Sequence, residues 1–276
     1  MTSLESIACR VCGNPVCIVF RGRLLNHEVD YHECRGCQYV QTEYPHWLAQ
    51  AYGQAINRSD TGILRRNERN ARLAIRTLVL LGKMRGCVID CAGGYGVLVR
   101  MLRDRGVDAR WSDPYCENLV ARGFEAELGS KADLMTAFEA LEHFVHPTEE
   151  LAALLARCDS LLVSTSLIPS PAPAPGSWWY YAPEHGQHIG FYRLRTLKWL
   201  ADRLGRHLVS DGKSFHLFTR EPVPRWRWML ARRTAIWALI LAKLRLRSLM
   251  WADHRRMSAL DASEASKNSN CTPEGR

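Results

Sequence analysis

Two periods of hydrophobic positions follow one another along the chain, and they predict alternating helices and strands. Apolar side chains recur at helical spacing over residues 71–81, with arginine and asparagine on the other face, and Gly82 is placed to end that helix. A short apolar run over 87–90 predicts a buried strand, and apolar residues at 97, 98, 101 and 102 predict the face of a second helix. Further strand patterns lie at 109–112, 133–138 and 161–165. This alternation predicts an α/β fold.

The pattern changes after the last of these strands. Prolines at alternate positions over 169–175 predict a stiff, extended loop rather than a helix. Residues 197–204 predict a helix that Gly205 closes, and residues 207–219 predict a hairpin that turns at Asp211 and Gly212.

Four cysteines near the N-terminus have the spacing of a metal site. Cys9 and Cys12 form one Cys-x2-Cys turn, Cys34 and Cys37 form another, and 21 residues separate the two turns. Each turn brings two thiolates to one side of a tight loop, so the pair supplies the four sulfurs of a tetrahedral Zn2+ site. Because no coordination position is left open, the ion is expected to stabilise structure rather than perform chemistry. This segment resembles a zinc ribbon.

A glycine-rich turn lies between the first predicted strand and the helix that follows it. The turn carries Ala92, Gly93, Gly94 and Gly96, and a strand, a glycine-rich turn and a helix form the first unit of nucleotide-binding α/β folds. Asp113 lies 17 residues beyond the last of these glycines, at the end of the next predicted strand. A carboxylate at that position accepts hydrogen bonds from two ribose hydroxyls. The two features together predict a cofactor that contains ribose.

From Asp90 the turn reads Asp-x-Ala-Gly-Gly-x-Gly, which resembles the first motif of class I S-adenosylmethionine (SAM) methyltransferases, with Ala92 in place of the first glycine. The resemblance implies that Asp90 orients the methionine end of SAM and that Asp113 holds its ribose. The segment that begins at Glu139 and ends in Glu-His resembles the fourth motif of the family, which implies that Glu139 also lies at the cofactor. The resemblance covers about residues 70–220 and implies a Rossmann-like sheet of seven strands.

The ligand crevice of such a sheet lies at the carboxyl ends of its strands, so the aromatic segment 178–192 is expected beside it. This segment resembles a stretch of methyltransferases that act on nucleotide-linked sugars, in which a Tyr-x-Glu-His segment supplies the base and a zinc-binding N-terminal region is present. Gln187 stands here in place of the Glu. We expect His188 to act as the base, with Glu184 or His185 as helper or substitute. The alternative is an aromatic lid that only shields the site.

Composition and charge change this picture only near the C-terminus. The 276 residues are 47% hydrophobic and 24% charged, as in ordinary globular proteins, and the formal net charge is +9. The stretch 220–256 holds ten Lys or Arg and two acids, so eight of the nine excess charges lie there. Tryptophans among these arginines predict a helix in a membrane interface over 225–251, since the uncharged run 234–242 is too short to span a bilayer. The alternative is packing against the core or a second subunit.

Five segments are therefore expected along the chain. They are a zinc ribbon at 1–43, a helical connector at 44–82, a SAM-binding methyltransferase domain at 83–221, a basic amphipathic helical segment at 222–257, and a disordered tail at 258–276, where Ser, Asn and Ala are frequent.

The expected activity is SAM-dependent methyl transfer to a small-molecule or glycan-type acceptor, sugar- or lipid-linked, with Zn2+ as a structural ion. Two other hypotheses remain open. One is RNA methylation, in which the zinc ribbon and the basic segment hold phosphates; the other is a non-catalytic zinc-ribbon binding protein. The N-terminus lacks the features of a secretory signal, and the expected location is the cytoplasm, free or at the membrane face.

Overall fold

A six-stranded sheet forms the centre of the computed structural model, which describes residues 7–52, 60–233 and 236–269. The strand order is β5-β4-β6-β7-β10-β9. These strands are β4 (Val88–Asp90), β5 (Ala109–Trp111), β6 (Ala132–Phe138), β7 (Cys158–Ser164), β9 (His207–Ser210) and β10 (Phe215–Thr219). The first four are parallel and β10 runs antiparallel to β7 and β9, which confirms the predicted α/β class and the predicted hairpin.

The expected seventh strand is absent from this sheet in the described part of the chain. Its place at the outer edge of β5 holds one isolated parallel bridge, between Trp111 and Glu125. The Trp111 N–H donates to the carbonyl of Phe124 at 2.8 Å, and the Ala126 N–H donates to the carbonyl of Trp111 at 2.8 Å. The chain therefore passes beside β5 as a strand would, but over too few residues to form one.

Helices cover both faces of the large sheet because its strands are apolar on both sides. Val88 faces one core and its neighbour Ile89 faces the other, and Leu134 and Met135 divide in the same way. The covering helices are α2 (Ile63–Leu80) and α3 (Val97–Arg103) on the first face, and α4 (Pro147–Ala156) and α5 (Leu194–Arg203) on the second. Gly82, with φ +69°, follows the end of α2 as predicted.

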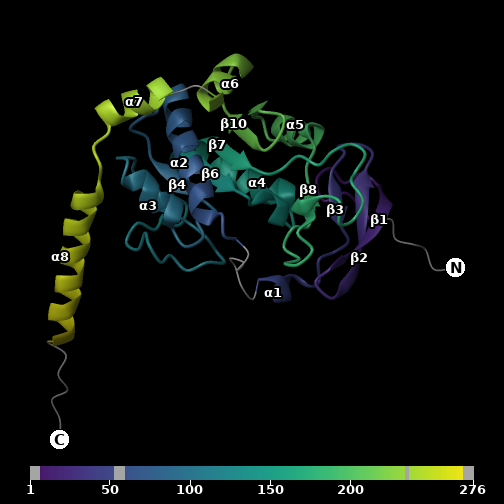
Figure 1. Ribbon diagram of the computed structural model, residues 1–276, viewed down its shortest axis with the longest axis horizontal. Coiled ribbons are helices and arrows are strands. Elements are labelled where there is room, and N and C mark those ends of the chain that lie inside the picture. Colours follow the sequence, from purple (N-terminus) through teal and green to yellow (C-terminus); the bar gives the residue numbers. More distant parts are fainter. Residues whose placement is uncertain (1–6, 53–59, 234–235, 270–276) are drawn as a thin grey trace, which may run out of the picture.

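A second, antiparallel sheet lies at the N-terminal end of the molecule (Figure 1). Its strands are β1 (Val16–Leu24), β2 (His27–Cys34), β3 (Val40–Thr42) and β8 (Gly190–Phe191). The short helix α1 (Leu48–Ala51) follows β3 in the sequence. The pairing of β3 with β8 joins Val40 to Phe191 and Gln41 to Gly190. The N-terminal segment is thus tied to the aromatic segment, which lies far along the chain.

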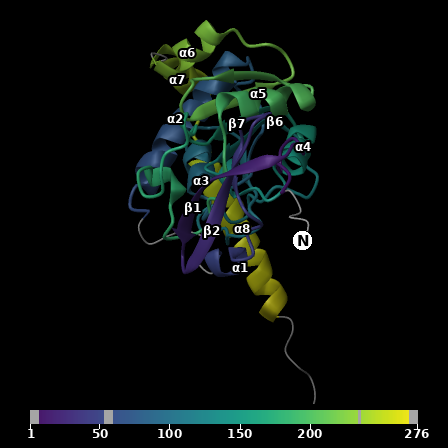
Figure 2. The same ribbon diagram turned by 90° about the vertical axis from the view of Figure 1, so that its right-hand side faces the viewer.

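Three helices end the chain: α6 (Arg225–Arg233), α7 (Ile236–Arg245) and α8 (Met250–Ser269). Trp228 of α6 is fully buried in the core beneath α2, so this part of the chain packs against the α/β core. In α8, Asp253 receives hydrogen bonds of 2.7–2.8 Å from Arg100 and Arg103. Beyond this contact α8 projects from the body in both views (Figures 1 and 2).

The predicted disordered tail is wrong over 258–269, which belong to α8. Alanine, leucine, glutamate and lysine, which have good helix propensity, occur there, and the ion pairs of Asp253 hold the start of the helix. Residues 270–276 lie outside the described residues. None of the helices in the described part of the chain combines the length and the apolar character that a membrane-spanning segment needs.

Candidate functional site

The glycine-rich turn lies where the order of the large sheet reverses. From β4 the chain passes through α3 to β5 on one side, and then crosses to β6 on the other side of β4. A crevice opens at the carboxyl ends of parallel strands at such a reversal, and ligands of open α/β sheets bind there. The turn follows Asp90, the last residue of β4, so it borders this crevice.

Trp111 and a left-handed glycine hold the shape of the turn. Gly96 directly precedes α3 and has a φ of +87°. Residues other than glycine rarely adopt this left-handed conformation. A Cβ atom on Gly93 would lie 2.4 Å from the ring of Trp111, and the indole Nε1–H donates to the carbonyl of Gly94 at 2.8 Å. Glycine at position 93 is therefore required by close packing against Trp111.

Two aspartates flank the turn. The carboxyl of Asp90 is buried and accepts a hydrogen bond of 2.7 Å from the hydroxyl of Thr136. Burial, with the nearby charge of Asp113, raises the pKa of Asp90 to about 7. The carboxylate of Asp113 accepts the Gly94 N–H at 2.9 Å and the N–H groups of the next loop at 2.8 and 3.0 Å. The crevice therefore presents two acids, one buried and one held by backbone donors, which suit a cationic ligand.

Glu139 lies at the carboxyl end of β6, on the neighbouring strand. Its backbone has a positive φ of +51°, and its N–H donates to the hydroxyl of Ser164 at 3.0 Å. The same hydroxyl donates to the Glu139 carboxylate at 2.5 Å. A non-glycine residue in this conformation is uncommon, and the two bonds to Ser164 hold it there. Asp90, Asp113 and Glu139 thus share one edge of the sheet.

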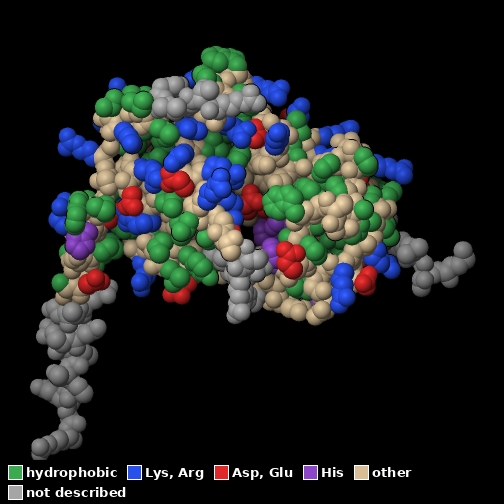
Figure 3. Space-filling model, in the orientation of Figure 1, with side chains coloured by type: hydrophobic (Ala, Val, Ile, Leu, Met, Phe, Trp, Pro, Cys, Tyr) green, Lys and Arg blue, Asp and Glu red, His purple; other side chains and the backbone are tan. Residues whose placement is uncertain are grey.

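A second group, Glu142, His143 and His188, forms what we call the Glu-His-His cluster. Glu142 and His143 lie in the 3-10 turn η1 (Leu141–His143), and His188 lies two residues before β8. One ligand atom from each residue lies within 4.8 Å of the other two, and the two imidazole rings are 5.0 Å apart. Figure 3 shows histidine side chains beside acidic ones, set back near the middle of this face.

Tyr180 orients two members of this cluster. Its hydroxyl donates to Oε1 of Glu142 at 2.6 Å, and its backbone carbonyl lies 2.7 Å from Nδ1 of His188. That nitrogen therefore carries the proton, which leaves Nε2 of His188 with a free lone pair. The hydroxyl of Tyr52 lies 3.3 Å from Nδ1 of His143. The cluster is therefore held in place by residues from two other segments of the chain.

Burial governs the charge of the cluster. The side chain of Glu142 is fully buried, which raises its pKa to about 8, and the nearby Glu139 adds to the shift. Burial lowers the pKa of His188 to about 4 and also lowers that of His143. Oε2 of Glu142 has no hydrogen-bond partner among the described residues. The protein therefore keeps two neutral imidazoles beside an unpartnered carboxyl oxygen.

The remaining candidates of the aromatic segment take different roles. His185 lies beside the cluster, with its ring 6.2 Å from that of His188 and its Nε2 3.3 Å from a carboxylate oxygen of Glu184. Gln187 is buried and donates to the carbonyl of Ala51 at 2.8 Å, so its amide holds α1. The expected catalytic group of His188, His185 and Glu184 is thus brought together.

Most aromatic rings of segment 178–192 are core residues rather than a binding surface. Tyr180 and Tyr181, in the 3-10 turn η2 (Trp179–Tyr181), are buried with Phe191 against β2 and β3. Trp179 is the exception, with 77% of its surface exposed. These rings therefore fill a core, and the aromatic lid stays a prediction.

The four N-terminal cysteines form a compact group at the edge of the small sheet. The Sγ atoms of Cys9 and Cys37 are 3.6 Å apart, and those of Cys12 and Cys34 are 3.4 Å apart. Zn–S bonds of about 2.3 Å in a tetrahedron place sulfurs about 3.8 Å apart, so the donor set and its size fit Zn2+. We call this group the four-cysteine cluster.

The Glu-His-His cluster is the part that the sequence analysis missed. Glu142 and His143 were visible only as the end of a motif, whereas His188 is 45 residues away from His143. The pairing of β3 with β8 and the contacts of Tyr180 bring them together. The only signal for this cluster in the sequence was a Glu-His pair after one predicted strand, together with a histidine much later in the chain.

Residues 63–210, more than half of the chain, match the model of a methyltransferase domain family, and the chain belongs to this family. The predicted methyltransferase class is thereby confirmed, while the predicted domain bounds of 83–221 stay a prediction. No curated protein is significantly similar in sequence to the chain.

Solved structures of other methyltransferases resemble parts of the molecule. An O-methyltransferase family protein from Burkholderia thailandensis has 13% identity and a TM-score of 0.48, over 69% of this chain and 66% of its own. Human N-acetylserotonin methyltransferase, solved with SAM, has 16% identity and a TM-score of 0.39, over 64% of this chain and 66% of its own. The magnesium protoporphyrin IX methyltransferase from Synechocystis PCC 6803 has 15% identity and a TM-score of 0.39, over 62% of this chain and 90% of its own. The chain spans just under two thirds of the first two proteins.

Proposed function

We propose that this protein transfers the methyl group of SAM to a hydroxyl group of a small-molecule or glycan-type acceptor, free or linked to a sugar or lipid carrier. The observation that carries the proposal is the pair of aspartates around the glycine-rich turn, with the Glu-His-His cluster at the end of the next strand. Membership of the methyltransferase domain family supports the reaction class. The acceptor chemistry is inferred from the cluster.

The cofactor is assigned to the crevice at the carboxyl ends of β4 and β5. SAM, when bound, supplies a methyl group that its sulfonium already makes electrophilic. The two acids fit this cation: Asp90 would orient its methionine end and Asp113 would hold its ribose. The remaining residues assigned to this site are Ala92, Gly93, Gly94, Gly96 and Glu139.

A hydroxyl acceptor must lose its proton, and the residues beside the crevice suit this step. We propose that an imidazole of His185 or His188 accepts this proton. A carboxylate oxygen of Glu184 lies 3.3 Å from Nε2 of His185, and the two imidazole rings are 6.2 Å apart. The chain must also hold the acceptor oxygen in line with the methyl carbon and the sulfur, and such orientation contributes about 7–11 kcal/mol to lowering a barrier.

The four-cysteine cluster is assigned to structural zinc. It also positions the acceptor side of the site, because elements around it contact the turns that hold the cysteines. Thr196 of α5 donates to the carbonyl of Cys37 at 2.9 Å, and Thr148 of α4 donates to the carbonyl of Val11 at 2.9 Å. The guanidinium of Arg10 donates to the carbonyl of Ile189, next to His188. The zinc would therefore support the segment that carries His188.

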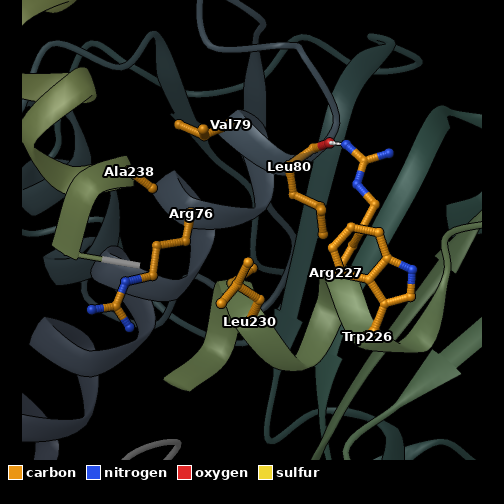
Figure 4. Close-up of a pocket in the computed structure, with 8 residues that line it drawn as sticks. Arg76, Val79, Leu80, Trp226, Arg227, Leu230 and Ala238 are labelled. Atoms are coloured by element: carbon orange, nitrogen blue, oxygen red, sulfur yellow. Dashed lines mark hydrogen bonds between the residues drawn. The ribbon is translucent and has the colours of Figure 1, made fainter. Parts of the chain in front are cut away.

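We assign the outer face of α6 and α7 to an anionic membrane surface. Trp226, Ile240 and Leu244 are 68%, 53% and 80% exposed. An apolar cavity of about 240 Å³ lies beside Trp226 (Figure 4). Its lining residues are Arg76, Val79, Leu80, Trp226, Arg227, Leu230, Ala231 and Ala238. Basic residues border this apolar face along 225–247, so its charge is complementary to anionic headgroups and its tryptophan suits the interface.

Calorimetry with SAM tests the cofactor site. Asp113→Ala should weaken binding about ten- to hundredfold, since a charge-assisted hydrogen bond contributes about 1.5–3 kcal/mol. Asp202→Ala, at an exposed position of α5, is the matched control and should bind as the wild type does. Absence of SAM binding by the wild-type protein would overturn the proposed function.

The acceptor class requires a separate assay. Transfer from methyl-labelled SAM is measured with hydroxylated sugars and phenols, with their amino analogues, and with RNA. We expect transfer to hydroxyl compounds; transfer to RNA alone, or to the amino analogues alone, would overturn the acceptor assignment.

Vesicle flotation tests the membrane face. The wild-type protein should float with vesicles that contain phosphatidylglycerol and not with pure phosphatidylcholine. Replacement of Trp226, Ile240 and Leu244 by serine should abolish flotation, whereas Leu128→Ser, at a fully exposed apolar position elsewhere, should not. Binding to RNA without flotation would favour a nucleic-acid partner instead.

A further inference from the structure

The Glu-His-His cluster has an unexplained polar atom at its centre. The carboxyl of Glu142 is fully buried, and its Oε2 has no hydrogen-bond partner among the described residues. A buried oxygen without a partner is unfavourable, and more so when it is charged. Ring nitrogens of His143 and His188 lie close to this carboxyl, with the three ligand atoms within 4.8 Å of one another. Something that accepts lone pairs would satisfy all three side chains at once.

The surroundings of the cluster leave one atom of His188 and one of Glu142 without a protein partner. Nδ1 of His188 donates to the carbonyl of Tyr180 at 2.7 Å, which leaves Nε2 as the acceptor. Oε1 of Glu142 is occupied by the hydroxyl of Tyr180 at 2.6 Å, which leaves Oε2. Histidine ligands of metal ions are commonly held by such a bond from their other nitrogen to a carbonyl or carboxylate. These two unused atoms suit a bound cation, whose binding would displace the proton of Glu142.

We propose that Glu142, His143 and His188 bind a divalent transition-metal ion. Two imidazoles and one carboxylate form a set that Zn2+, Fe2+ and Co2+ accept, and three protein ligands leave positions open for water or substrate. This set differs from the four-cysteine cluster, which closes its ion with four thiolates. The role of the ion rests on the proposed function: the acceptor hydroxyl occupies an open position.

With the ion bound, His188 and His185 have different roles. His188 is a ligand, so the hydroxyl proton passes to His185, whose Nε2 lies 3.3 Å from Glu184. Binding of the hydroxyl oxygen to the cation lowers the pKa of that hydroxyl. The oxygen lone pair then forms the O–C bond to the methyl group, and the C–S bond breaks with its electron pair on sulfur. The products are the methyl ether and S-adenosylhomocysteine, and no oxidant or reductant is needed.

Metal counting tests the proposal without an acceptor. The full-length protein is stripped of metal, reloaded with Co2+ alone, dialysed and analysed for cobalt content, with circular dichroism as the check on folding. The wild type should hold two ions per chain, one of which gives thiolate-to-cobalt charge-transfer absorption. His188→Gln and Glu142→Gln should each hold one ion and keep that absorption. His146→Ala, at an exposed position three residues from His143, is the matched control and should hold two.

A complementary variant removes the other ion. Cys34→Ser with Cys37→Ser should lose the charge-transfer absorption and keep one ion with only ligand-field bands. If this double variant does not fold, the comparison of His188→Gln with His146→Ala decides. Equal cobalt content in wild type, His188→Gln and Glu142→Gln would overturn the proposal.

Failure of this inference is distinguishable from failure of the proposed function. SAM affinity is measured by calorimetry on the same His188→Gln protein, because the assigned cofactor residues lie outside the cluster. SAM binding with a single cobalt ion in the wild type would remove the metal site and leave the methyltransferase proposal. Two cobalt ions in a wild-type protein that does not bind SAM would support the metal site and overturn the methyltransferase proposal.

Discussion

The four-cysteine cluster and the Glu-His-His cluster differ in what their donors can do. Four thiolates at 3.4–3.6 Å spacing form a closed set on tight turns near the surface of the small sheet. One carboxylate and two imidazoles form an incomplete set beside the predicted crevice. A closed set can only hold structure, whereas an incomplete one can bind a reactant. The number of protein donors, more than their burial, therefore distinguishes a structural metal site from one that can bind a reactant.

The two clusters are connected through β8. Ile189 lies between His188 and the start of β8, and its carbonyl accepts hydrogen bonds from Arg10 and from the hydroxyl of Thr42. Its N–H donates to the carbonyl of Glu142 at 2.9 Å. This one residue therefore contacts the four-cysteine side and the Glu-His-His side through its backbone. Loss of the first cluster should weaken metal binding at the second without abolishing it, and loss of the second should leave the first intact.

Removal of the four-cysteine cluster is expected to have the largest effect. Cys34→Ser with Cys37→Ser should lower the free energy of unfolding by more than about 4 kcal/mol, because zinc binding contributes folding free energy directly. Urea denaturation followed by circular dichroism measures this loss, and zinc analysis should fall by one ion per chain. Cys17→Ser, at an exposed position of β1, should change stability by less than about 0.5 kcal/mol. Unchanged zinc content in the double variant would contradict the zinc assignment.

Stepwise chelation should separate the two ions in the wild-type protein. A mild chelator should first remove the ion of the open set, with a fall in melting temperature of less than about 3 °C. A stronger chelator should then remove the zinc of the four-cysteine cluster, with a further fall of about 10 °C or more. Differential scanning calorimetry with metal analysis at each step measures both. Loss of both ions together, in one unfolding step, would contradict the division between support and chemistry.

The four-cysteine cluster was predictable from sequence because its ligands come in two local pairs. Cys9 with Cys12 and Cys34 with Cys37 each lie on one turn, so spacing alone reports their geometry. The alternation of strands and helices likewise predicted β4, β6, β7 and the hairpin of β9 and β10, because their periodicity is set by local backbone geometry.

The Glu-His-His cluster was not predictable in this way. Its members come from η1 and from the segment before β8, and only the tertiary fold joins them. The aromatic segment misled for the opposite reason: Tyr180 and Tyr181 have the composition of a binding surface, yet they fill a core that the small sheet provides. A single sequence contains no local signal for either contact.

Arg10 should transmit part of the effect of one cluster to the other. Arg10→Ala removes the donor to the Ile189 carbonyl, which costs about 1–3 kcal/mol when the carbonyl stays buried. We expect Co2+ affinity at the Glu-His-His cluster to fall about tenfold, with the zinc of the four-cysteine cluster retained. Arg35→Ala is the matched control, because Arg35 follows Cys34 as Arg10 follows Cys9 but is exposed. Equal cobalt titrations for the two variants would show that β8 does not couple the clusters.

The smallest effect concerns a site that should be independent of both clusters. Burial raises the pKa of Asp90 from 3.8 to about 7, so at pH 6 this carboxyl is mostly protonated and at pH 8 it is mostly ionised. Only the ionised form attracts a cationic ligand, so SAM affinity should rise up to about tenfold from pH 6 to pH 8. The folded protein binds this proton more tightly than the unfolded chain, so the stability contributed by Asp90 should fall as the pH rises from 3.8 to about 7 and level off above that.

Asp90→Asn gives the test of that assignment. Calorimetric titrations with SAM at pH 6, 7 and 8 should show a slope in the wild type and weak, pH-independent binding in the variant. Removal of the open-set ion by the mild chelator should leave the slope unchanged, since no residue of the Glu-His-His cluster contacts Asp90 among the described contacts. A slope that persists in Asp90→Asn and disappears with the ion would place the titrating group in the cluster instead, and the cofactor and acceptor sides would then have to be treated as one electrostatic unit.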